Sequence, residues 1–174
     1  MESKHKPHIA ILSDWYLPGF GAGGPIQSIS NFVRAMGDEF QLSVITRNKD
    51  HNTSQPYGDI IPNEWLERPE GAQAYYFSEA ELSKKNLFGV IADLEPDFLY
   101  VNSLFSLPFT IWPLQYVGNK KGTPRLLLAP RGMLHAGALQ QKKLKKMAFI
   151  RLMRITGISK RIWWQATDEQ EIKD

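Results

Sequence analysis

The stretch that decides the fold is residues 8–46, HIAILSDWYLPGFGAGGPIQSISNFVRAMGDEFQLSVIT. It begins with the apolar run HIAIL (8–12) and ends with QLSVIT (41–46), and each of these predicts a buried strand. Between them, Pro25 is suited to the first turn of a helix. Apolar residues then recur at helical spacing, at Ile26, Ile29, Phe32, Val33 and Met36. The order strand, loop, helix, strand predicts a βαβ unit.

The same alternation continues along the chain. Further strands are expected at 74–77, 97–102, 125–129 and 161–167, and the polar segment 47–73 predicts a long loop. Helices are expected after a capping box of Ser78 and Glu81, over 107–118 with a break at Pro113, over 138–155 and from Asp168 onward. This pattern predicts an α/β fold, with a Rossmann-like, doubly wound, mainly parallel sheet and helices on both faces. Ligands of such folds bind beyond the carboxyl ends of the strands.

Length and composition limit the class of protein. The 174 residues suit one domain, and 43% hydrophobic with 22% charged residues is typical of a soluble globular chain. There is no cysteine, which excludes disulfides and thiolate metal sites and fits a reducing compartment. The amino terminus has no pattern of a signal peptide, and no apolar run approaches a membrane span. We therefore expect a cytoplasmic location.

The charges are unevenly distributed along the chain. Residues 1–97 hold 14 acidic and eight basic residues, whereas residues 98–167 hold 12 basic residues and no acidic one. Such a segment predicts a surface that faces an anionic partner, such as phosphates or lipid head groups. Nucleic acid is not an expected partner, because the chain has no recognised nucleic-acid-binding motif.

The glycine-rich loop PGFGAGGPIQS (18–28) permits three interpretations. It contains G-x-G-x-x-G, but six residues separate the strand from Gly19 and the second strand ends in Arg47, so only an NADP-binding oxidoreductase fits that motif. It can also be a surface loop. The third interpretation places Gly23 and Gly24 at a helix start whose free N–H groups face an anion, a diphosphate above all.

Four stretches together resemble one known family. They are SDWYLPGFGAGGPIQSISNFVRAM (13–36), PDFLYVNSLFSLP (96–108), LLLAPRGMLHAGALQQKKLKKMAF (126–149) and WQATDEQEIKD (164–174). These look like the amino-terminal half of family 4 glycosyltransferases, which are retaining, hexosyl-transferring enzymes of the two-domain GT-B fold. The resemblance covers nearly the whole chain, and its most specific part is PRGML followed by ATDEQE.

The resemblance implies that two domains have separate roles in the reaction. Residues 1–174 would form the amino-terminal, acceptor-side domain, and the donor-binding domain with its two glutamates would be absent, so this domain alone should not catalyse transfer. Gly23 and Gly24 would approach the diphosphate of a nucleotide sugar, which is a co-substrate, and no further cofactor is expected. The acceptor would be a glycan or a lipid-linked molecule in the synthesis of polysaccharide, lipopolysaccharide or glycolipid.

The candidate acceptor-binding residues follow predicted strands. They are Asp14, Asn102, Ser103, Arg131 and His135. Many family members have histidine where Asn102 stands, and an amide can donate a hydrogen bond but cannot exchange a proton near neutrality, so an acid–base role is not expected there. Relatives often show histidine at the position of Arg131, whose planar guanidinium would suit a phosphate or carboxylate. No histidines have metal-ligand spacing, and no metal is predicted.

The basic helix over 138–155 suggests a further partner. Leu144, Met147, Ala148, Leu152 and Ile155 lie along one side, and Phe149, Ile150 and Met153 lie among the lysines of the other side. The lysines Lys142, Lys143, Lys145 and Lys146 cover the other side and either form a solvated face or dock on an anionic membrane. The protein would then be peripheral at the inner face of the membrane, and a non-catalytic docking module is the third alternative for its function.

Overall fold

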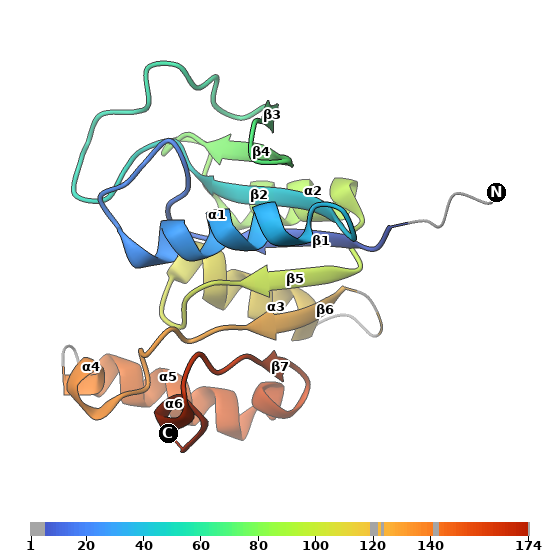
Figure 1. Cartoon of the computed structure of the whole chain (residues 1–174). Coiled ribbons are helices and arrows are strands. Elements are labelled where there is room, and N and C mark those ends of the chain that lie inside the picture. The colour runs from blue at the N-terminus through green and yellow to red at the C-terminus, as the bar shows by residue number, and fades with distance from the viewer. Residues whose placement is uncertain (1–5, 119–121, 123, 141–142, 174) are drawn as a thin grey trace.

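In the computed structural model, a sheet of seven strands separates two layers of helices (Figure 1). The structure describes residues 6–118, 122, 124–140 and 143–173. The strands are β1 (His8–Leu12), β2 (Gln41–Arg47), β3 (Trp65–Arg68), β4 (Ala72–Phe77), β5 (Phe98–Val101), β6 (Arg125–Leu128) and β7 (Trp163–Trp164). Their order is β3-β4-β2-β1-β5-β6-β7, and every neighbouring pair is parallel except β3 with β4. The predicted α/β class is confirmed.

Helices cover both faces of this sheet. They are α1 (Gly24–Met36), α2 (Lys84–Leu94), α3 (Trp112–Gly118), α4 (Ala136–Gln140), α5 (Lys143–Ile155) and α6 (Glu169–Lys173), with a π-helical turn at Leu107–Ile111 and a 3₁₀ turn at Ile158–Lys160. Successive strand residues point to opposite faces. Ile9 and Ile11 of β1 therefore pack with α1, whereas Ala10 and Leu12 pack with α2, α3 and Met153 of α5. Burial on both faces explains why β1 is apolar throughout.

The connections leave a topological switch point beside β1. The chain passes from β1 to β2 and β4 on one side, and then returns to β5 on the other side of β1. The carboxyl ends of the parallel strands share one edge, at the left of Figure 1, together with the loop that leads into α1. In open α/β sheets this is where ligands bind, so we place the candidate site here.

Two predictions about the middle of the chain were wrong. The segment 47–73 is not all loop, because β3 adds an antiparallel edge strand and its Trp65 packs edge-on against Tyr75 at 5.3 Å. Helix α2 begins at Lys84, and its cap is Ser83, whose side chain accepts a hydrogen bond from the Asn86 N–H. The Ser78 hydroxyl does accept from the Glu81 N–H at 3.3 Å, but in the turn before the helix, where Ser78 also exchanges hydrogen bonds with the side chain of Asn63. That long-range pairing holds Ser78 in the turn before the helix.

The last third of the chain also differs from expectation. Instead of a break at Pro113, a π-helical turn changes into α3 at Trp112, one residue earlier. The described part of the predicted basic helix consists of α4 and α5. The final strand is limited to Trp163 and Trp164, because it pairs with β6 alone and the chain then turns into α6. Among the described residues, no helix is long and apolar enough to cross a membrane.

Candidate functional site

The glycine-rich loop is held by Asp50, which lies beyond the end of β2. Its carboxylate accepts hydrogen bonds from the backbone N–H groups of Phe20 at 2.9 Å, Gly21 at 2.9 and 3.1 Å and His51 at 2.7 Å. Burial alone would raise the pKa of Asp50, but these bonds outweigh it and lower the pKa below its ordinary value. A Cβ at Gly19 would overlap the Tyr57 hydroxyl and lie 2.9 Å from the Asp50 Oδ1, so a larger residue there would displace these side chains.

Gly23 and Gly24 form the exposed start of α1. Gly23 is the N-cap, with φ +61° and ψ −114°, and no side chain caps the helix. The Gly23 N–H is not free as predicted, because it donates to the Phe20 carbonyl at 2.9 Å. Within the described chain, the N–H groups of Gly24 and Ile26 have no protein acceptor. The N–H groups left open at this helix start are therefore those of Gly24 and Ile26.

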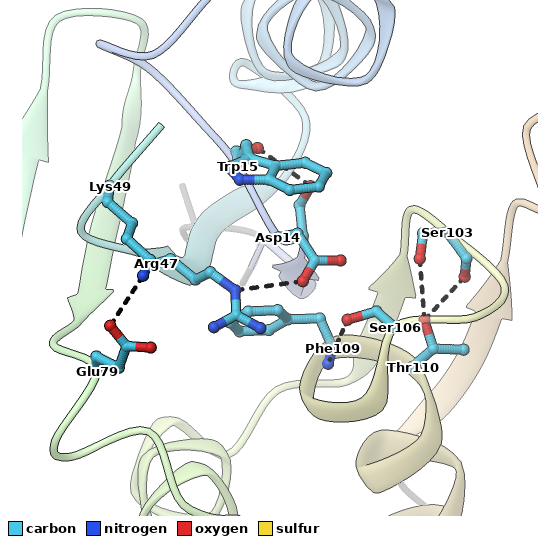
Figure 2. Close-up of polar contacts among 10 residues, drawn as sticks. Asp14, Trp15, Arg47, Lys49, Glu79, Ser103, Ser106, Phe109 and Thr110 are labelled. Atoms are coloured by element: carbon cyan, nitrogen blue, oxygen red, sulfur yellow. Dashed lines mark hydrogen bonds and ion pairs between the residues drawn. The ribbon is translucent and has the colours of Figure 1, made fainter. Parts of the chain in front are cut away.

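Asp14 follows β1 and pairs with the end of β2 (Figure 2). The Arg47 Nε lies 3.4 Å from the Asp14 Oδ1, and the guanidinium carbon lies 5.6 Å from the centroid of the Phe109 ring. Both charged side chains are about one fifth to one quarter exposed, at 18% for Asp14 and 25% for Arg47. Arg47 is thus occupied within the chain, which weighs against its holding the 2′-phosphate of NADP.

Ser103 lies near this pair and also has partners within the chain. Its hydroxyl is 3.3 Å from that of Thr110, which donates to the Ser103 carbonyl at 3.0 Å. Ser106 caps the same π-helical turn, because its hydroxyl accepts from the Phe109 N–H at 3.2 Å. Figure 2 shows these contacts beside the ring of Phe109. Asp14 therefore links the end of β1 to the end of β2, and Ser103 links the end of β5 to the π-helical turn, on the face of the sheet that α2 and α3 cover.

Asn102 and Arg131 form a second polar group on the opposite face. Arg131 follows β6 with φ +55°; its Nε donates to the Asn102 Oδ1 at 2.9 Å and its Nη2 donates to the Tyr100 hydroxyl. Tyr100 packs against Phe32 of α1, with ring centroids 5.1 Å apart, and this contact places the group on the α1 face. Asn102 is only 2% exposed, and its Nδ2 is a buried donor without a partner in the described chain. Asn102 thus orients Arg131 instead of facing solvent.

The turn that carries Arg131 is held from α6. Glu171 is 6% exposed and accepts hydrogen bonds from the N–H of Gly132 and from the N–H and hydroxyl of Thr167. Burial would raise the pKa of Glu171, but these bonds outweigh it and lower the pKa. His135 has a partner within the chain, because its Nε2 lies 3.5 Å from the Asp168 carboxylate. Sequence reasoning missed Glu171, since 39 residues separate it from Gly132.

A cavity of about 550 Å³ lies beside this turn. Its walls are mainly apolar and include Leu104, Leu134, Met147, Met153, Trp164 and Ile172. It could hold an apolar group next to the polar carboxyl edge. Sequence reasoning gave no indication of it, because the walls come from segments that are far apart in the chain and meet only after folding.

The predicted lysine cluster is divided by the fold. Lys143 and Lys145 are exposed on α5, whereas the Lys146 Nζ donates to the Ala138 carbonyl at 2.6 Å and lies 4.9 Å from the centroid of the Phe105 ring. Lys142 lies outside the described residues. Among the residues that the structure describes, no group of three or more His, Cys, Asp or Glu side chains is arranged to hold a metal ion.

Two positive features therefore lie on one face of one edge: the uncapped start of α1 and the guanidinium of Arg131. Asp14 and Ser103 lie on the other face, so the five candidate acceptor residues do not form a single cluster. Comparison of the chain with protein-family models, curated proteins and solved structures found no match.

Proposed function

We propose that this chain is the acceptor-side domain of a retaining, nucleotide-sugar-dependent glycosyltransferase of the GT-B type, acting in the synthesis of polysaccharide, lipopolysaccharide or glycolipid. The observation that carries the proposal is the position of the α1 start and Arg131 on one face of the carboxyl edge. Both features favour negative charge, and the leaving group of a nucleotide sugar is a diphosphate.

The expected interaction free energies are large enough for these donors to assist the reaction. A helix start favours an anion by about 0.3–1 kcal/mol, and each hydrogen bond to a charged group contributes about 1.5–3 kcal/mol. Donors at the α1 start and on Arg131 would thus stabilise the charge that develops on the diphosphate as the glycosidic bond to it breaks. They are held in place before the reaction, because Asp50 fixes the loop before α1 while Asn102 and Tyr100 fix Arg131.

Other parts of the protein would bind the donor and the acceptor. In this proposal, the nucleotide and the donor sugar bind an opposing domain that the 174 residues do not include. His135, which lies on the same turn 130–135 as Arg131, faces the acceptor. Asp14 and Ser103 contact other residues of the chain and stabilise the carboxyl edge of the sheet, which carries the site.

The test uses the protein translated from the complete reading frame. Acceptor-dependent release of nucleotide is measured over a panel of sugar nucleotides with glycan and lipid-linked acceptors. Gly24→Val should reduce kcat/KM about tenfold or more, because a branched side chain would stand over the N–H groups at the start of α1. Gly89→Val is the matched control, since Gly89 is an exposed helical glycine of α2 with open space around it.

Two results would contradict the proposal. One is a folded full-length protein without acceptor-dependent release for any sugar nucleotide. The other is equal activity of the Gly24 and Gly89 variants. Calorimetry with NADP tests the oxidoreductase alternative in the same preparation: tight binding that Arg47→Ala abolishes would replace the glycosyltransferase assignment.

A further inference from the structure

Helix α5 presents an apolar face to solvent. Leu144, Leu152 and Ile155 are 87%, 57% and 74% exposed. Their spacing of eight and three residues places them along one side of the helix. The side that packs inward contains Met153, which is 4% exposed, and the half-buried Phe149 and Ile150.

The inward packing fixes the rotation of the helix. Phe149 packs edge-on against Phe105 with ring centroids 5.9 Å apart, and Met153 belongs to the core cluster that includes Leu87 and Leu114. Lys146 is bound to the Ala138 carbonyl on the same flank. The exposed aliphatic side chains on the opposite side are therefore held outward.

Basic side chains border this apolar face. Lys145 lies on one flank, Lys143 and Arg154 lie on the other, and Arg151 lies next to Leu144 around the helix, on the side of Arg154; all four are exposed. Among the described residues, none of these four side chains forms an ion pair with an acidic side chain. We define the docking face as Lys143, Leu144, Lys145, Ala148, Arg151, Leu152, Arg154 and Ile155.

The combination of an apolar centre and cationic flanks favours one partner. A helix of this kind lies flat in the boundary between head groups and acyl chains, where the aliphatic groups leave water and the cations meet phosphate. Nucleic acid would account for the cations but not for the aliphatic centre. A second copy, paired face to face, would bring like charges together.

We propose that the docking face of α5 binds this chain reversibly to anionic lipid bilayers. The proposal does not depend on the glycosyltransferase assignment. Each basic residue near an anionic bilayer contributes about fivefold to binding, so the four would give an enrichment of several hundredfold over a neutral bilayer.

Vesicle co-sedimentation of the chain tests the proposal. The vesicles are pure phosphatidylcholine, or phosphatidylcholine with about one third phosphatidylglycerol. Only the anionic vesicles should bind the chain, and binding should weaken as salt is raised. Lys143→Glu with Lys145→Glu should weaken binding at least about 25-fold, which corresponds to the loss of two basic contacts.

Two further variants separate the parts of the argument. Lys6→Glu with Arg34→Glu changes the net charge equally, but these residues lie away from α5, on the segment before β1 and on α1; binding should stay within about twofold of the unaltered chain. Leu144→Ser with Leu152→Ser keeps every charge and should weaken binding about tenfold or more. Both leucines are exposed, so the fold should be retained, and circular dichroism checks this.

Several outcomes would overturn the proposal. They are equal binding to both kinds of vesicle, equal losses for the α5 and control charge variants, and binding that the leucine variant leaves unchanged. A chain that ignores vesicles but forms a dimer dissociated by the leucine variant would make the face a self-interface. Charge-dependent binding to duplex DNA without vesicle binding would assign it to nucleic acid.

Discussion

The substitution Asp50→Asn tests how the glycine-rich loop is held at the edge of the sheet. It keeps the size of the side chain but removes the charge that accepts hydrogen bonds from the N–H groups of Phe20, Gly21 and His51. We expect a lower free energy of unfolding and a loosened loop before α1, with the core of the sheet unchanged.

The magnitude follows from these contacts. A hydrogen bond to a charged acceptor contributes about 1 kcal/mol more than a neutral one, and three N–H groups lose that advantage. Phe20 and Gly21 are exposed, and solvent weakens such interactions. The expected loss is therefore about 1–2 kcal/mol, which lowers Tm by about 2–8 °C in a chain of this length.

The pH dependence has a definite sign. The pKa of Asp50 is lower in the folded chain than the ordinary value of 3.8, so folding favours the charged form. The stability difference between the unaltered chain and Asp50→Asn should be complete well above pH 3.8 and should disappear as the pH falls through the lowered pKa.

Urea denaturation across this pH range gives the free energies, and hydrogen exchange of the Gly21 amide reports the loop itself. Asp59→Asn is the control, because Asp59 is an exposed carboxylate in the same connection, and it should change stability by less than about 0.5 kcal/mol. Equal stability of the two variants at neutral pH, with unchanged exchange at Gly21, would refute this account of the loop.

Two further predictions concern the start of α1 and the rotation of α5. Gly23→Ala should destabilise the chain by about 1–3 kcal/mol, because an L side chain is strained at φ +61°. Gly24→Ala should be neutral or slightly stabilising. Urea denaturation measures both free energies of unfolding, and equal effects would contradict the described backbone. Met153→Ala should cost about 2–5 kcal/mol as a core truncation, whereas Leu152→Ala should cost less than about 0.5 kcal/mol. If the costs in thermal unfolding were reversed, α5 would face the core with the other side.

Much of the fold could be predicted from local patterns. The apolar run of β1 predicts a strand buried on both faces, and the spacing of Ile26, Ile29 and Val33 predicts the buried side of α1. Their alternation then predicts the parallel sheet and the edge where its strands end. These features depend on neighbours within a few residues, so they can be inferred from the sequence.

The candidate site depended on contacts between distant segments. Asp50 reaches Gly21 across 29 residues, Arg131 reaches Asn102 across 29 and Glu171 reaches Gly132 across 39. Nothing in the local pattern distinguishes these side chains from solvated ones. Sequence reasoning consequently placed a free N–H at Gly23 and an accessible amide at Asn102, whereas the fold occupies the first and buries the second.

For helix α5, the sequence determines the character of the helix and the tertiary structure determines which side faces the core. Its sequence determines that it is helical, basic and apolar on two sides, one with Leu144 and Leu152 and the other with Phe149 and Met153. Periodicity is the same whichever side faces inward. Only the tertiary structure decides, because Phe149 and Met153 find partners in Phe105 and the core, and the two leucines are then left facing water.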